Sequence, residues 1–128
     1  KTNLIFTKAN ADTDGRIINQ IIDNYVKKNP KKAAAYISLG QIRYLSALHF
    51  VDGVIGNSSS GIIEAPSVGV GTVNIGNRQE GREFSKSITS CDCQSNKIIN
   101  ILNKILYKFY IYIIQPFIKS FIIPKTTD

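Results

Sequence analysis

The stretch VDGVIGNSSSGIIEAPSVGVGTVNIG, residues 51–76, decides the fold class of this chain. Its two ends, 51–56 and 71–76, are short runs rich in Val, Ile and Gly, as buried strands often are. Between them lie a serine-rich loop and a short apolar segment that predicts a helix, which Pro66 shortens or kinks. A strand, a helix and a second strand in succession predict two parallel strands joined by a right-handed crossover.

The same alternation continues on the N-terminal side of this unit. Short apolar runs predict extended segments at 3–9 and 33–39, and helical periodicity predicts helices at 14–28 and 41–50. The first of these helices ends at Asn29-Pro30 and carries apolar residues at helical spacing, namely Ile17, Ile18, Ile21, Ile22 and Tyr25. Strands and helices that alternate in this way predict an α/β fold, a doubly wound, Rossmann-like parallel sheet with flanking helices.

The length and composition are those of one modest globular domain. The chain has 128 residues, of which 43% are hydrophobic, so we expect one core and an ordered chain. Its net charge of +7 is unevenly distributed, because residues 97–128 hold five lysines and one aspartate, or +4 of the total. No basic face interleaved with aromatic residues is present in the sequence, so we expect no nucleic-acid partner.

The cysteines and the first residues indicate a cellular compartment. Cys91 and Cys93 are one residue apart, which is too close for an ordinary structural disulfide, and the second ligand pair of a zinc site is missing. The opening KTNLIFTKAN, residues 1–10, lacks the apolar core of a signal peptide. We therefore expect reduced thiols in a cytoplasmic protein. The chain does not begin with Met, which suggests a fragment of a longer protein.

The serine loop has the composition of an anion site. Ser58, Ser59 and Ser60 offer hydroxyls and backbone N–H groups at the start of a helix, and Gly61 lets the backbone come close to a ligand. In parallel sheets such loops lie beyond the carboxyl ends of the strands, where ligands bind. Glu64 follows about one turn later and would accept hydrogen bonds from sugar hydroxyls, since a carboxylate beside a phosphate would repel it. The alternative is a capped helix, because serine is a common N-cap and a carboxylate near the N-terminus suits the helix dipole.

Two further loops flank predicted strands. NIGNRQEGR, residues 74–82, follows a strand, so Arg78 and Arg82 are candidates to bind phosphate from the same edge of the sheet, with a solvated loop as the alternative. NADTDG, residues 10–15, matches the opening of a calcium loop, but Ile21 stands where such a loop needs a Glu. We therefore expect a turn into the helix there and predict no metal site.

Together these stretches resemble a known family. FTKANADTDGRIIN, VIGNSSSGIIEAPSVG and VNIGNRQEGR, in this order, are similar to the C-terminal domain of UDP-N-acetylglucosamine 2-epimerases, above all the hydrolysing branch of the sialic-acid pathway. The resemblance spans about residues 3–104. It implies a partial C-terminal domain of an enzyme with two Rossmann-like domains, the glycosyltransferase-B-like arrangement, in which the nucleotide sugar lies between the domains.

The resemblance also implies roles for individual residues. Ser58 and Ser59 would hold the diphosphate, Glu64 the ribose hydroxyls and Arg78 the nucleotide, in agreement with the roles expected from the loops themselves. Asn10 would face the nucleotide and Leu39 would lie against the uracil, and the Leu39 role rests on the resemblance alone. The family's acid and base carboxylates belong to an N-terminal domain that this sequence lacks. His49, the chain's single histidine, does not match a family motif, and we expect it to be a partly buried structural residue.

The last part of the chain, residues 105–128, is a divergent tail rich in Ile, Phe, Tyr and Lys, distinct from the partial nucleotide-binding domain of residues 1–104. A docked helix, an out-of-frame or disordered end, and membrane association are the three interpretations. Residues 105–123 are largely apolar, but Lys108 and Lys119 disfavour a membrane span.

The predicted function is the UDP-binding half of a hydrolysing UDP-N-acetylglucosamine 2-epimerase. Its ligand would be UDP or UDP-N-acetylglucosamine, with no cofactor, and the chain alone would be inactive. Two other classes stay open. One is a half-domain of a sugar transferase, which shares the fold. The other is a non-catalytic remnant or interaction module, in which a sheet edge exposed by a missing first strand would favour self-association into a homo-oligomer.

Overall fold

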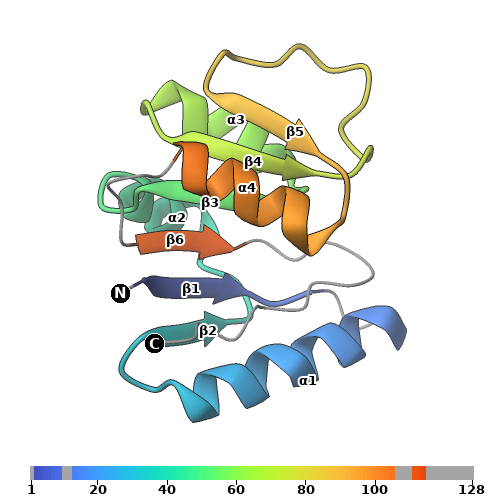
Figure 1. The fold of residues 1–128 in the computed structure, drawn as a ribbon. Coiled ribbons are helices and arrows are strands. Elements are labelled where there is room, and N and C mark those ends of the chain that lie inside the picture. Colours follow the sequence, from blue (N-terminus) through green and yellow to red (C-terminus); the bar gives the residue numbers. More distant parts are fainter. Residues whose placement is uncertain (1, 10–12, 106–110, 115–128) are drawn as a thin grey trace.

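The computed structural model describes residues 2–9, 13–105 and 111–114. They form a six-stranded parallel sheet in the order β2-β1-β6-β3-β4-β5, flanked by helices (Figure 1). The α/β, Rossmann-like fold predicted from the sequence is confirmed. The elements in chain order are β1 (Asn3–Thr7), α1 (Thr13–Lys28), β2 (Ala33–Tyr36), α2 (Gly40–Leu48), β3 (Gly53–Gly56), α3 (Ser59–Ser67), β4 (Gly71–Ile75), β5 (Ile88–Cys91), α4 (Ser95–Ile105) and β6 (Ile111–Ile114).

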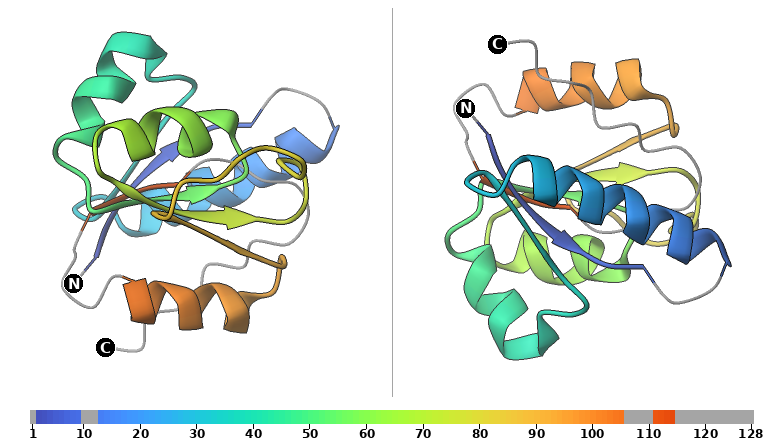
Figure 2. Two further views of the ribbon diagram at one scale, coloured as in Figure 1. Left: turned by 90° about the horizontal axis from the view of Figure 1, so that it is seen from above. Right: turned by 90° about the horizontal axis from the view of Figure 1, so that it is seen from below.

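The helices cover both faces of the sheet. The two views of Figure 2 place α2 and α3 on one face and α1 and α4 on the other. Each pair packs over its own apolar cluster. The cluster under α1 and α4 includes Ile22 and Ile98, and the cluster under α2 and α3 includes Leu48 and Ala65. This two-sided burial is what makes the sheet doubly wound.

The alternation of side chains along β3 and β4 explains how the two clusters are separated. In β3, Val54 belongs to the cluster of α2 and α3, whereas Ile55 belongs to the cluster of α1 and α4. Their partners in β4 are Thr72 and Val73. Because successive residues of a strand point to opposite faces, β4 presents apolar side chains towards α4 and polar ones towards α3. Strands buried on both faces are usually apolar throughout, so this polar face is unusual.

Helix α1 buries only part of its apolar surface. Ile22 is buried, and the ring of Tyr25 packs edge-on against Phe6 with 5.8 Å between ring centroids. Ile17 and Ile21 keep 56% and 47% of their surface exposed. The helical spacing therefore predicted the helix correctly, but its buried stripe is narrower than the run of isoleucines.

The structure contains three elements that the sequence did not predict, namely two strands of the sheet and one helix. β5 forms one edge, and α4 follows it on the face shared with α1. β6 lies in the middle of the sheet, where it pairs in parallel with β1 on one side and β3 on the other. Residues 111–114 are thus a central strand and not the docked helix that was one interpretation of the tail. The position between β1 and β3 is filled, and the open edges of the sheet are β2 and β5.

The rest of the tail, 106–110 and 115–128, lies outside the described residues. The apolar window 105–123 falls largely in those parts. In the described part of the chain, no helix has both the length and the apolar character needed to cross a membrane.

Candidate functional site

The serine loop leaves β3 at the carboxyl edge of the sheet. Gly56, the last residue of β3, has a φ of 152°, which L side chains rarely adopt. The chain then passes through buried Asn57 to Ser58, and α3 begins at Ser59. β3 and β4 are parallel neighbours with Gly56 opposite Asn74, so the loop after β4 emerges beside the serine loop. The two stretches predicted to share an edge of the sheet do so.

Ser58 is the N-cap of α3. It has extended backbone angles, φ −73° and ψ 145°, and its hydroxyl accepts a hydrogen bond from the Ser60 N–H at 3.4 Å. The Ser58 and Ser60 hydroxyls lie 3.0 Å apart. The cap bond is longer than the usual 2.9–3.0 Å of a strong N–H···O bond, so it holds this hydroxyl loosely. Capping and ligand binding are therefore compatible roles for Ser58.

The remaining predicted ligand residues differ in exposure. Ser59, in the first turn of α3, and Arg78 and Arg82, in the loop after β4, are exposed. Glu64 is half-buried in the second turn of α3, and its Oε2 is buried with no hydrogen-bond partner among the described residues. Gly61 is buried in the first turn. The predicted ligand residues thus combine a helix N-terminus, two exposed cations and the carboxylate of Glu64, and exposed Glu80 and Glu83 lie in the same loop as the arginines.

Buried polar side chains from β4 and its loop hold the serine loop at both ends. The Thr72 hydroxyl donates to the Gly61 carbonyl at 2.7 Å, and the Gln79 amide Nε2 donates to the Asn57 carbonyl at 2.8 Å. Thr72 is 2% exposed and Gln79 is 4% exposed. Neither residue was predicted from the sequence to belong to the site. The one signal for Thr72 is a polar residue at an alternate position of an apolar strand. The one signal for Gln79 is its place directly after Arg78.

The two residues predicted by resemblance alone lie farther from this loop or outside the described chain. Leu39 is the N-cap residue of α2, half-buried against the cluster under α2 and α3. It follows β2, which is separated from β3 by β1 and β6, although all these strands end at the same edge. Asn10 lies outside the described residues, as does Asp12. In the described ranges, no group of three or more His, Cys, Asp or Glu side chains could hold a metal ion.

His49 differs from its expected environment. It is exposed, and it follows the last residue of α2, where its backbone N–H donates to the Ser46 carbonyl at 3.2 Å. The expectation of a partly buried structural histidine is therefore wrong. Helix α2 ends at Leu48, one residue before His49, so His49 does not belong to the buried face of the helix.

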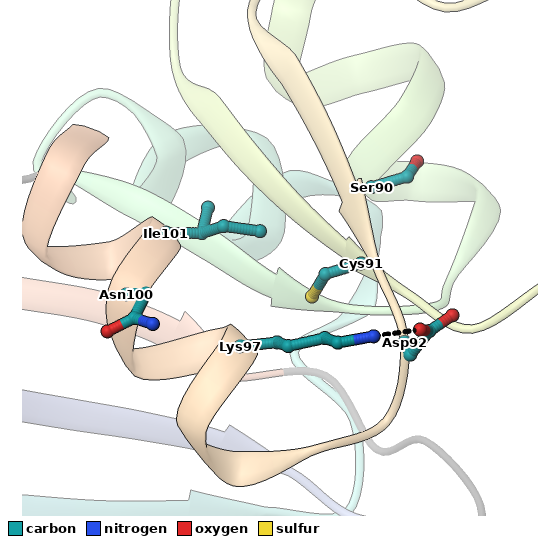
Figure 3. Close-up of a pocket in the computed structure, with 6 residues that line it drawn as sticks. All are labelled: Ser90, Cys91, Asp92, Lys97, Asn100 and Ile101. Atoms are coloured by element: carbon teal, nitrogen blue, oxygen red, sulfur yellow. Dashed lines mark hydrogen bonds and ion pairs between the residues drawn. The ribbon is translucent and has the colours of Figure 1, made fainter.

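A separate hollow lies between β5 and α4. Its volume is about 400 Å³, and it is lined by Ser90, Cys91, Asp92, Lys97, Asn100 and Ile101 (Figure 3). Lys97 forms an ion pair with Asp92, and this hydrogen bond and charge lower the pKa of Asp92. Burial raises the pKa of the Cys91 thiol, and Asp92 and Cys93 raise it further. Cys91 and Cys93 are not joined in a disulfide bond. None of the predicted ligand residues that the structure describes lines this hollow.

Comparison with known proteins gives the same family as the motifs. The family model described as UDP-N-acetylglucosamine 2-epimerase matches residues 1–117. The chain is 49% identical over 86 residues to a GDP/UDP-N,N'-diacetylbacillosamine 2-epimerase (hydrolyzing) of Campylobacter jejuni. It is 36% identical over 113 residues to the polysialic acid biosynthesis protein P7 of Escherichia coli, and 31% identical over 102 residues to a UDP-N-acetylglucosamine 2-epimerase of Neisseria meningitidis.

The matches cover most of this chain but a small part of each relative. They span 67%, 88% and 80% of the chain, in the order given above. They span 22%, 28% and 26% of the relatives' lengths, so the chain corresponds to about a quarter of each.

Proposed function

The chain belongs to the UDP-N-acetylglucosamine 2-epimerase family, and on this premise we propose that it is the UDP-binding part of a hydrolysing enzyme of the sialic-acid type. The observation that carries the proposal is the serine loop, which opens α3 beside the loop that bears Arg78 and Arg82. Helix N-termini attract anions because their first N–H groups lack helical partners and the helix dipole places partial positive charge there.

The diphosphate is assigned to the serine loop. Ser58 and Ser59 would donate hydroxyl and backbone N–H hydrogen bonds, with Ser60 and Gly61 shaping the turn. Arg78 would add a charged fork from the neighbouring loop, and Arg82 lies in the same loop as further support. Hydrogen bonds to a charged group contribute about 1.5–3 kcal/mol each, so a few of them suffice for measurable affinity.

Glu64 is assigned to the ribose hydroxyls. It lies in the second turn of α3, beyond the serines, which keeps its negative charge away from the diphosphate. Its buried Oε2 has no donor among the described residues, and an unsatisfied buried polar atom costs about 1–3 kcal/mol. A ribose hydroxyl that donates to this oxygen would supply the missing partner and relieve that cost.

For the whole enzyme we infer the reaction that the resemblance to the family implies. A base removes the proton on carbon 2 of the sugar while UDP leaves, and water then adds to the resulting glycal, which gives N-acetylmannosamine and UDP. The leaving diphosphate gains negative charge in the transition state, and oriented N–H donors and arginine stabilise that charge. We assign this stabilising task to the present chain and expect no sugar release by it alone.

A second sugar is a specific alternative. The relative with 49% identity is named for N,N'-diacetylbacillosamine, which carries two acetamido groups. The name of that relative gives GDP as well as UDP as the nucleotide. Each of these sugar nucleotides carries a diphosphate, so the serine loop and Arg78 would serve either sugar. An assay of the complete enzyme with both sugar nucleotides would separate them.

Calorimetric titration of the 128-residue chain tests the proposal. We expect UDP to bind more tightly than UMP, and UMP more tightly than uridine. Arg78→Ala should weaken UDP binding about tenfold, which corresponds to 1.4 kcal/mol. The matched control is Arg43→Ala, which removes an exposed arginine of α2 and should leave the affinity unchanged. Equal affinities for UDP and uridine would contradict the diphosphate assignment, and release of N-acetylmannosamine by the chain would contradict its inactivity.

A further inference from the structure

Gln79 is a buried residue in an exposed loop. Its neighbours at 76–78 and 80–86 are exposed, whereas Gln79 is 4% exposed. Burial of a primary amide is unfavourable unless the amide finds hydrogen-bond partners. Gln79 is therefore shielded from solvent while the rest of the loop is not, and its hydrogen bond explains this burial.

That contact reaches the serine loop. Gln79 Nε2 donates to the carbonyl oxygen of Asn57 at 2.8 Å, and Asn57 is itself 7% exposed. Asn57 directly precedes Ser58, the N-cap of α3. The hydrogen bond is therefore a direct, buried link between the loop after β4 and the residue at which the serine loop begins.

The same residue organises both arginines. Arg78 is adjacent to Gln79 in the chain, so its Cα lies about 3.8 Å from that of Gln79. The Gln79 carbonyl accepts a hydrogen bond from the Arg82 N–H at 3.3 Å, and a second turn closes from the Glu80 N–H to the Asn77 carbonyl at 3.0 Å. Anchoring Gln79 thus restrains the backbone at both arginines, while their side chains stay exposed.

We propose that Gln79 is a positioning residue that sets the placement of Arg78 relative to the serine loop, an inference that rests on the proposed UDP site. Arg78 and the serine loop would contact one diphosphate at a lower cost if their separation is fixed before the ligand arrives. Preorganisation of this kind lowers the ordering cost of binding. Gln79 itself is buried and does not need to touch the ligand.

The first test uses the ligand-free chain. Gln79→Met keeps the length of the side chain and removes the donor, and Gln20→Met makes the same change on the exposed face of α1. We expect hydrogen exchange at the amides of 57–61 to become at least about tenfold faster in Q79M and to stay unchanged in Q20M, because loss of the anchor opens the loop. If Q79M fails to fold, Gln79→Asn replaces it, since its shorter amide cannot reach Asn57 without a shift of the loop.

The second test measures coupling to Arg78. If Gln79 positions Arg78, then Arg78→Ala should weaken UDP binding about tenfold in the wild-type chain but less than threefold in the Q79M background. A residue with a merely structural role would lower affinity by a factor that multiplies with that of R78A.

Each outcome decides the inference. Faster exchange in Q79M together with non-additive affinities supports it. Unchanged exchange at 57–61, or affinity losses that multiply, would overturn it. Should the wild-type chain fail to bind UDP while Q79M still exchanges faster, the proposed function fails and the anchoring of the serine loop by Gln79 stands.

Discussion

Replacement of Thr72 by Val tests whether polar support from β4 shapes the first turn of α3. The two side chains have nearly the same shape, so the change removes one buried hydroxyl with little effect on packing. That hydroxyl donates to the Gly61 carbonyl at 2.7 Å, and Thr72 is 2% exposed. The substitution therefore isolates the contribution of a single hydrogen bond.

The expected loss can be bounded from the geometry. A neutral hydrogen bond contributes about 0.5–1.5 kcal/mol net, and an acceptor left wholly unpaired would raise the loss to about 3 kcal/mol. Gly61 lies within α3, so its carbonyl remains in position for a helical bond to Ala65. We therefore expect a decrease of about 1 kcal/mol in the free energy of unfolding, or about 3–5 °C in Tm for a chain of this size.

Urea denaturation followed by circular dichroism measures this change. The midpoint should fall while the slope with urea stays constant, because the native surface is unchanged. Thr89→Val is the matched control on β5, at an edge of the sheet where Thr89 is half-buried, and should change stability by less than about 0.5 kcal/mol. A T72V chain as stable as wild type, or a T89V chain equally destabilised, would refute the support role of Thr72.

Two further predictions concern the sheet and the hollow. Ile113 lies opposite Ile5 of β1 and Val54 of β3. Ile113→Pro removes a backbone donor from this central strand and should lower the free energy of unfolding by about 3 kcal/mol or more in the same urea assay. Lys86→Pro, in an exposed loop, should cost less than about 1 kcal/mol, and equal effects would contradict the central place of β6. Because burial raises the pKa of Cys91, less thiolate is present at neutral pH, so in a Cys93→Ser chain iodoacetamide should react more slowly with the folded protein than with the urea-unfolded protein. The rate should rise as pH approaches the raised pKa, and a faster reaction of the folded chain at neutral pH would contradict the shift.

The sequence identified the fold class because its signals were local. The runs at 51–56 and 71–76 predicted β3 and β4, and the periodicity of 14–28 predicted α1, each within a few residues of its observed bounds. Such patterns reflect side chains that pack within one element or its immediate neighbour. Parallel pairing of successive strands then followed from the short helical connections.

Elements that depend on distant pairing were not predicted. β5, with the sequence ITSC, has little apolar alternation, because it forms an edge of the sheet. β6 is an apolar run, IYII, but nothing local indicates that it lies between β1 and β3 in the sheet. Both of these strands precede β6 by more than fifty residues in the sequence. A tail of that composition suits several structures, and only the pairing distinguishes them.

The candidate ligand residues could be chosen from the sequence by their chemistry, whereas the buried residues that support the serine loop could not. Serine, arginine and carboxylate side chains around a loop indicate ligand chemistry directly, so the sequence alone was enough to predict Ser58, Ser59, Glu64 and Arg78 as ligand residues. Gln79 stands among exposed polar residues, and its burial results from a contact with Asn57 that is 22 positions away. A hydrogen bond between two loops forms only when the chain is folded, so no local sequence pattern predicts it.

The central claim is that the N-terminal turn of α3 binds the diphosphate of UDP, and amide chemical shifts test it most directly. We expect UDP titrated into the isotope-labelled chain to shift the amides of 57–64 and of Arg78, with saturation at a common dissociation constant. Amides of α4, on the opposite face of the sheet, should stay in place. No shift at 57–64 at millimolar UDP, or shifts confined to other parts of the chain, would contradict the account.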